Sequence, residues 1–250
     1  MFRKITKIGG FLLLAAFVIV TLAFTSLQYR NALCRNIEID YEPDEIIHVD
    51  KDELVRLVTA ADTKILGKKL DQINAELIEA AVEKHDAILK AEVYKVVARG
   101  DSSNYKGVVG VRVKHREPVV RIMSNEANYY LDEFGGKIPI SRNYTANVLV
   151  ATGTFDEKYA KEDLLPCVLH IENDEFWEAQ IEQVHVEKSG EVILTPLVGD
   201  HIIELGKLDN YEEKLRNMEA FYKKVLANDN WNKYSSVSLK YKNQVVAKRR

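Results

Sequence analysis

The sequence has little of what enzymes and nucleic-acid-binding proteins usually need. Its 250 residues include only two cysteines, Cys34 and Cys167, which are too few for a disulfide framework and leave either one bridge or two free thiols. The formal net charge is −3, whereas proteins that bind nucleic acid are normally basic. The six histidines are scattered, and no histidine has a second His or Cys at metal-binding spacing. We therefore predict no catalytic, cofactor or metal site and no nucleic-acid partner.

One short motif is an exception. Ser103 to Lys106 fits S-x-x-K, the nucleophile motif of penicillin-binding proteins. That chemistry needs the serine at the start of a helix, together with S-D-N and K-T-G elements, and the sequence has neither element. The segment also has the composition of a polar turn between two strands. We interpret the match as chance and predict that the protein is not an enzyme.

One long apolar run stands out in a sequence that otherwise lacks them. Residues 9–27 carry no charge, and as a helix they would span roughly 28 Å, close to the thickness of the hydrocarbon core. Three basic residues precede the run, which favours a cytoplasmic N-terminus. We predict a single uncleaved transmembrane helix at 9–27, a cytoplasmic tail at 1–8 and a juxtamembrane linker at 28–35. A cleaved signal peptide is the alternative, but its apolar region is usually shorter.

Residues 36–115 have the pattern of a compact mixed α/β unit. A short strand at 36–42 precedes a helix that begins after Asp50, where Asp50 and Glu53 resemble a capping box. A second helix is expected over 72–85. Two alternating strands follow, "AEVYKVVA" and "GVVGVRVK". The predicted order is β-α-α-β-β.

The pattern becomes β-rich after Pro118. Short strand-like runs are separated by glycine and asparagine turns. They are interrupted by a short helix that begins near Asp163 or Asp174 and ends near Gln183, and by a clear helix over 209–226. Asp209 with Glu212 predicts a capping box for the second helix. The last run, residues 235–247, alternates apolar and polar residues. We predict it to be the final strand of a sheet, with a free edge, because only a basic tail follows it.

An extended segment, "VRVKHREPVVRI", joins the two parts. Proline gives no ladder hydrogen bond and restricts the residue before it, so we assign Arg116, Glu117 and Pro118 to a domain junction between 36–115 and 116–250. The alternative is a proline on an edge strand inside one domain.

These motifs, taken in order, resemble the FtsQ family of bacterial cell-division proteins, also called DivIB. The resemblance rests on the apolar anchor, the β-α-α-β-β unit and the turn Arg116-Glu117-Pro118. It also rests on the hairpin "YLDEFG" at 130–135 and on the end "HIIELG", helix, "VSLKYKNQVV". The proline often seen at the start of the family strand that resembles "VLVATG" is absent here. The match covers nearly the whole chain.

The resemblance implies a POTRA domain, then a β-rich domain with a C-terminal helix and edge strand, in an α+β protein. It implies a non-enzymatic scaffold of the division machinery at the septum of the inner (plasma) membrane, with its C-terminal domains outside the cytoplasm. Its expected partners are FtsB and FtsL, other divisome membrane proteins, and the lipid bilayer through residues 9–27. The alternative is a membrane-anchored extracytoplasmic enzyme or chaperone-like factor.

The expected binding site is the last strand. FtsQ proteins hold FtsB through their last strand, and exposed edges bind extended segments through main-chain hydrogen bonds. Leu239, Lys240 and Tyr241 match the hydrophobic-basic-tyrosine triplet of the family, and Val237 and Ser238 precede them. We predict that these five residues bind the partner. The basic residues there are equally compatible with protection of the edge against aggregation.

Overall fold

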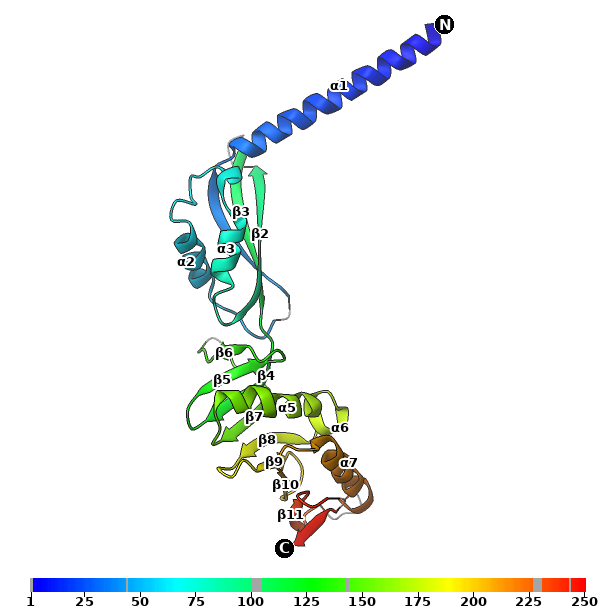
Figure 1. Ribbon diagram of the computed structural model, residues 1–250. Helices are drawn as coiled ribbons and strands as arrows, with labels where there is room; N and C mark the ends of the chain where they lie inside the picture. Colours follow the sequence, from blue (N-terminus) through cyan, green and yellow to red (C-terminus); the bar gives the residue numbers. More distant parts are fainter. Residues whose placement is uncertain (1, 44, 100–104, 143, 227–230, 243) are drawn as a thin grey trace. The chain divides into compact units, whose positions relative to one another are not determined.

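The chain forms two compact units in a computed structural model that describes residues 2–43, 45–99, 105–142, 144–226, 231–242 and 244–250 (Figure 1). The N-terminal unit comprises Met1–Glu45 and Val49–His115, and the C-terminal unit comprises Ile46–His48 and Arg116–Arg250.

A long helix, α1 (Phe2–Asn31), opens the chain and includes the predicted span at 9–27. Large apolar side chains between residues 11 and 22 are exposed to solvent along it. No helix in the described part of the chain is long and apolar enough to cross a membrane. The side chains of residues 24–27 lie outside those that the structure describes.

The N-terminal unit has the predicted β-α-α-β-β order. Its three strands are β1 (Cys34–Tyr41), β2 (Ile88–Arg99) and β3 (Tyr105–His115), in the spatial order β1-β3-β2. β1 is parallel to β3, and β2 is antiparallel to it. The helical elements are α2 (Lys51–Ala61), a 3₁₀ turn η1 (Leu70–Gln72) and α3 (Ala75–Val82).

Side-chain caps fix the starts of both short helices. The Asp50 carboxylate accepts from the Asp52 amide at 2.8 Å, and the Asn74 side chain accepts from the Leu77 amide at 3.1 Å. Each cap satisfies an amide that has no partner within its own helix.

The C-terminal unit is built on a nine-stranded mixed sheet. The spatial order is β12-β11-β10-β9-β8-β7-β4-β5-β6, so the first strands of the unit lie towards one end and the last strands at the other. The strands are β4 (Pro118–Ser124), β5 (Asn128–Asp132), β6 (Lys137–Pro139), β7 (Leu149–Gly153), β8 (Ile181–Val186), β9 (Val192–Pro196), β10 (Ile202–Gly206), β11 (Tyr234–Ser238) and β12 (Val246–Arg249).

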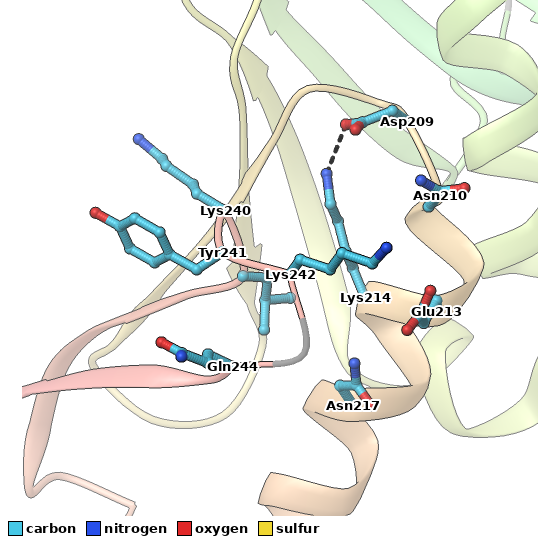
Figure 2. Close-up of a pocket in the computed structure, with 10 residues that line it drawn as sticks. Asp209, Asn210, Glu213, Lys214, Asn217, Lys240, Tyr241, Lys242 and Gln244 are labelled. Carbon is cyan, nitrogen blue, oxygen red and sulfur yellow. Dashed lines mark hydrogen bonds and ion pairs between the residues drawn. The ribbon is translucent and has the colours of Figure 1, made fainter.

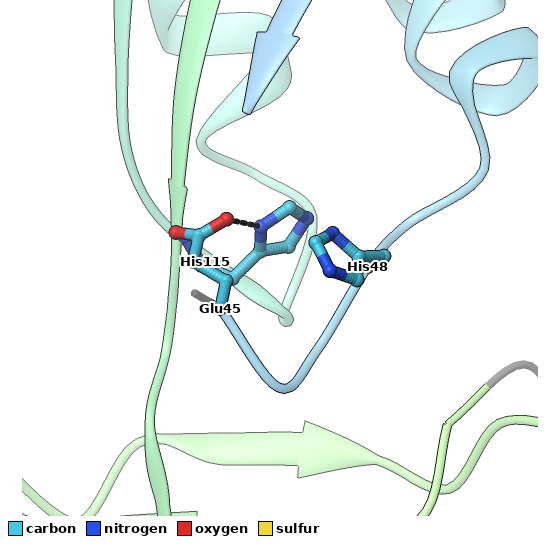
Figure 3. Close-up of side chains that lie close together, drawn as sticks. All are labelled: Glu45, His48 and His115. Atoms are coloured by element: carbon cyan, nitrogen blue, oxygen red, sulfur yellow. Dashed lines mark hydrogen bonds and ion pairs between the residues drawn. The ribbon is translucent and has the colours of Figure 1, made fainter. Parts of the chain in front are cut away.

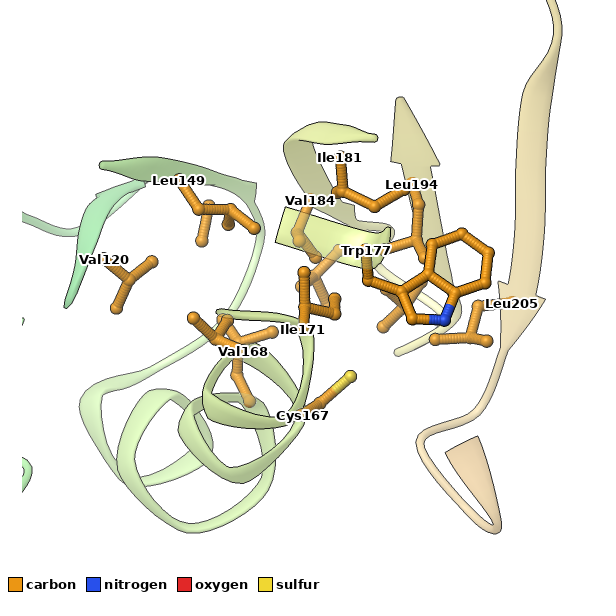
Figure 4. Close-up of a cluster of buried hydrophobic side chains, with 14 of the residues drawn as sticks. Val120, Leu149, Cys167, Val168, Ile171, Trp177, Ile181, Val184, Leu194 and Leu205 are labelled. Atoms are coloured by element: carbon orange, nitrogen blue, oxygen red, sulfur yellow. The ribbon is translucent and has the colours of Figure 1, made fainter. Parts of the chain in front are cut away.

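Two helical segments contribute buried side chains to the core of this unit, together with the strands of the sheet. The first contains α4 (Glu157–Tyr159), a π-helical turn η2 (Ala160–Leu164), α5 (Leu165–Glu172) and α6 (Glu175–Glu178). The second contains α7 (Tyr211–Phe221) and a π-helical turn η3 (Tyr222–Leu226). Figure 4 shows Cys167, Val168 and Ile171 from the first segment facing strand residues.

Both cysteines are buried free thiols. Burial in the core raises the pKa of the Cys167 thiol to about 12. Cys167 therefore behaves as a small apolar residue rather than as a nucleophile.

The predicted capping box at Asp209 is wrong. The residue before α7 is Asn210, which adopts a left-handed backbone conformation with φ of 49° and makes no side-chain cap. The Asp209 carboxylate instead accepts from the Lys214 amine at 2.8 Å. A close cation satisfies the carboxylate as well as helix amides would, and this hydrogen bond lowers the pKa of Asp209.

Candidate partner-binding edge

The two edges of the nine-stranded sheet differ in whether their outward backbone groups are available for pairing with another strand. At one end, β6 has only three residues and finishes at Pro139, which has no amide hydrogen. The Tyr144 hydroxyl donates a short hydrogen bond to the Pro139 carbonyl. A short strand with proline and a capped carbonyl is a closed edge.

The other end is formed by β12, not by the strand that the sequence predicted. We predicted one final strand over 235–247 with a free edge. Instead this run is split into β11 and β12, which pair antiparallel, and β11 also pairs parallel with β10. Among the described strands, β12 pairs with β11 alone. The prediction that this strand has a free edge is wrong, because the chain turns back after it and β12 pairs with that edge of β11.

The hydrogen bonds of β11 and β12 show which backbone groups remain on the open side. The Leu239 amide donates to the Glu204 carbonyl of β10 at 2.9 Å. Because backbone groups alternate sides, those of Val237 also face β10, whereas those of Ser236 and Ser238 face β12. Ser236 and Ser238 are opposite Lys248 and Val246. Since backbone groups alternate sides along a strand, those of Ala247 and Arg249 point to the open side of β12.

The five residues predicted to bind a partner therefore divide into two groups. Val237 and Ser238 are buried inside β11, between two neighbouring strands, and the Leu239 side chain is buried in the core. Lys240 is engaged within the chain. Tyr241 is 59% exposed. Of the five, Lys240 and Tyr241 are exposed, and the Lys240 amine is engaged in an ion pair.

Lys240 joins three segments of the C-terminal unit. Its amine lies 2.6 Å from the Glu191 carboxylate beside β9 and 3.8 Å from the Glu204 carboxylate on β10. The hydrogen bond with Glu191 raises the pKa of Lys240 and lowers that of Glu191. With Leu239 buried beside it, this ion pair fixes the backbone from which Tyr241 projects.

A pocket lies between the first turns of α7 and the segment that follows β11 (Figure 2). Its volume is about 170 Å³. The lining includes residues with amines, carboxylates and amides, which suits hydrogen bonding with a polar group. The lining residues are Asp209, Asn210, Glu213, Lys214, Asn217, Leu239, Lys240, Tyr241, Lys242 and Gln244.

The last residue holds the end of β12 in place. The Arg250 guanidinium donates to the Asp200 carbonyl at 2.9 Å and lies 3.2 Å from its carboxylate, and the Arg250 amide donates to the Lys233 carbonyl at 3.2 Å. β12 is therefore tied at its end to the loop before β10. The side chains of Lys248 and Arg249 in β12 are exposed cations.

The residues assigned to the junction have a clear structural role inside the C-terminal unit. β3 ends at His115 and β4 begins at Pro118, so the extended segment is interrupted at 116–117. The Arg116 guanidinium lies 2.6 Å from the Asp132 carboxylate. Pro118 is buried opposite Asp132 in the β4–β5 pair, whereas Glu117 is exposed.

Asp132 organises the turn between β5 and β6. Besides Arg116, its carboxylate accepts from the amides of Phe134 at 2.9 Å and Gly136 at 2.6 Å. A Cβ atom at Gly136 would come within 2.4 Å of the Arg116 guanidinium. The sequence singled out both motifs, but it did not show that they contact each other.

Glu45 is a structural residue that sequence reasoning missed. In the N-terminal unit its carboxylate accepts from the His115 backbone amide at 2.8 Å and lies 2.6 Å from Nδ1 of the His115 ring (Figure 3). The Val49 amide donates to Nε2 at 3.1 Å, which places the ring proton on Nδ1. With both ring nitrogens engaged, this buried histidine supports the end of β3.

The S-x-x-K match cannot be followed as a unit, because Ser103 lies outside the described residues. Lys106 lies in β3, a strand rather than the helix that the penicillin-binding chemistry requires.

Comparison with known families agrees with both units. A family model described as "FtsQ/DivIB, C-terminal related" matches residues 117–248, and one described as a POTRA-like domain matches residues 32–99. The first match covers more than half of the chain. The matches confirm a POTRA-like domain followed by a β-rich domain, and the chain belongs to the family described as FtsQ/DivIB, C-terminal related. No curated protein matches the chain.

Proposed function

Because the chain belongs to the FtsQ/DivIB C-terminal-related family, we propose that it is a non-enzymatic scaffold of the bacterial division machinery that binds FtsB and FtsL. It would link early to late division proteins at the septum. The observation that carries the proposal is the open edge of β12, at the end of a sheet whose other edge is closed by Pro139.

The binding mechanism is strand addition to β12. An extended partner segment accepts from and donates to the outward backbone groups of Ala247 and Arg249, while its side chains set the register. Tyr241, exposed just before β12, adds an aromatic contact of the kind that dominates interface energies. This shifts the proposed site from Val237 and Ser238, which are interior, to Tyr241 and β12.

The charge of the edge favours an acidic partner. Lys242, Lys248 and Arg249 are exposed. Cations on an edge strand protect it from pairing with like-charged copies of itself. An acidic segment removes that repulsion and is attracted to the same residues, so protection and recognition are compatible.

We further propose that residues 9–27 anchor the chain in the inner membrane with a cytoplasmic N-terminus. The exposed apolar side chains at 11–22 support this, since a run of large apolar side chains in contact with water has a free-energy cost unless that surface is covered. In spheroplasts, protease should digest a tag at residue 250 and spare a tag at residue 1. Recovery of a soluble mature form lacking residues 9–27 would contradict the anchor.

The test of strand addition is a proline on β12. Arg249→Pro removes one outward amide and no bond to β11, whereas Arg249→Ala removes the same charge and keeps the amide. We expect the full chain in detergent to bind FtsB at least about tenfold more weakly with proline than with alanine, as loss of a main-chain hydrogen bond at an interface predicts. Equal affinities of the two folded variants would rule out strand addition at β12.

A further inference from the structure

The N-terminal unit has its own long edge strand. β2 has 12 residues and, among the strands that the structure describes, pairs with β3 alone, so its other edge carries a row of outward backbone groups. An edge of this length is a template for pairing with another chain. Helix α3 packs against β2 (Figure 1).

Two glutamates of this helical segment occupy part of that edge. The Val93 amide donates to the Glu79 carboxylate at 2.7 Å, and the Ala91 amide donates to the Glu83 carboxylate at 3.1 Å. Charge-assisted bonds of this kind are stronger than those between neutral groups. The two carboxylates therefore act on the edge as the carbonyls of a neighbouring strand would.

The spacing explains why two glutamates suffice. Residues four apart on a helix are about 6 Å apart along its axis, and residues two apart on a strand are about 6.7 Å apart. Glu79 and Glu83 thus match the alternate amides of Val93 and Ala91, with the helix running opposite to the strand. One turn before Glu79 the residue is Ala75, which has no carboxylate, so the match ends there.

We propose that Glu79 and Glu83 form a carboxylate seal that closes the Ala91–Val93 part of the β2 edge against strand addition, above all by β2 of a second copy of this chain. The seal confines access to the later part of the strand, where the amides of Lys95 and Val97 point to the same side by alternation. This inference concerns the POTRA-like domain and is independent of the function proposed for β12.

The first test needs no substitution. Residue-resolved hydrogen exchange on the full chain in detergent should show the amides of Ala91 and Val93 protected at least about tenfold relative to Lys95 and Val97, since hydrogen bonds to charged groups exceed the free energy of a tenfold change. Equal exchange at the four amides would overturn the proposal, whatever the behaviour of any variant.

The second test removes the seal. The double variant Glu79→Ala/Glu83→Ala should lose the protection and bind a synthetic peptide of residues 88–99, or self-associate in sedimentation experiments. The control Glu79→Gln/Glu83→Gln keeps an acceptor oxygen at each position and should remain protected and monomeric. A folded alanine variant that neither binds the peptide nor self-associates would overturn the proposal.

Discussion

Asp132→Ala should strongly destabilise the C-terminal unit. The Asp132 side chain is 3% exposed and accepts three hydrogen bonds: one from Arg116, and one each from the amides of Phe134 and Gly136. Alanine removes all three hydrogen bonds at once. It leaves the Arg116 guanidinium without its carboxylate and two turn amides without their partner.

The magnitude follows from the burial of each group. Removing one partner of a fully buried ion pair costs about 3–5 kcal/mol. Here the Arg116 side chain is 25% exposed, so water recovers part of its loss, while the two amides each lose a charge-assisted bond. We expect a loss of about 2–4 kcal/mol in the free energy of unfolding.

The protein provides its own reporter and controls. Both tryptophans, Trp177 and Trp231, lie in the C-terminal unit, so tryptophan fluorescence in a urea titration reports on that unit. Asp132→Asn keeps an acceptor oxygen for the amides but loses the charge, so it should cost less than alanine. If alanine costs under about 0.5 kcal/mol, or if asparagine is equally damaging, the carboxylate is not what holds this turn.

Further predictions concern Tyr241 and His201. Tyr241→Ala should weaken FtsB binding by about 1–3 kcal/mol in titration calorimetry without changing the urea midpoint, because the ring is exposed. The nearby Leu239→Ala should instead lower the free energy of unfolding by about 2–5 kcal/mol, because its side chain is buried. The opposite pattern would contradict the assignment of Tyr241 to the partner and of Leu239 to the core. His201 is buried, with Nε2 3.0 Å from the Tyr222 hydroxyl, and desolvation lowers its pKa. The unfolded state therefore binds the proton more readily, so the stability His201 contributes is complete above about pH 6.5 and is lost as the pH falls towards its folded pKa. His201→Gln should flatten the fall in urea midpoint between pH 7 and pH 5, and an unchanged slope would show that other groups cause it.

Local patterns in the sequence were sufficient where a single segment determines its own structure. The helix after Asp50 follows from its polar cap and apolar periodicity, and periodicity alone predicted a helix over 72–85, where the structure has α3. The alternating runs that became β2 and β3 are the longest strands of the N-terminal unit. Periodicity specifies which face of an element is apolar, and this was enough to predict the β-α-α-β-β order.

Local patterns failed where the structure of a segment depends on which other segment it contacts. Residues 235–247 alternate well enough to predict one strand, but the chain turns after Tyr241 and β12 pairs back on β11. The same limit applies to Lys240. Its charge suggested a partner contact, yet the Glu191 carboxylate, 49 residues away along the chain, satisfies it. A sequence pattern cannot show which of several carboxylates reaches a given lysine.

The edges of the two sheets illustrate what kind of protection leaves room for binding. Proline at β6 removes a donor permanently, and the Glu79 and Glu83 carboxylates beside β2 accept hydrogen bonds from two outward amides of that strand within the same unit. At β12 the protection consists of exposed cations, which repel like-charged strands but leave the outward amides of Ala247 and Arg249 unblocked. Only this last kind of protection is lifted by a property of the partner, namely negative charge. An edge guarded by charge therefore discriminates among extended segments, whereas proline or an internal carboxylate closes the backbone position it occupies to every segment, and this is the physical reason that we propose recognition at β12.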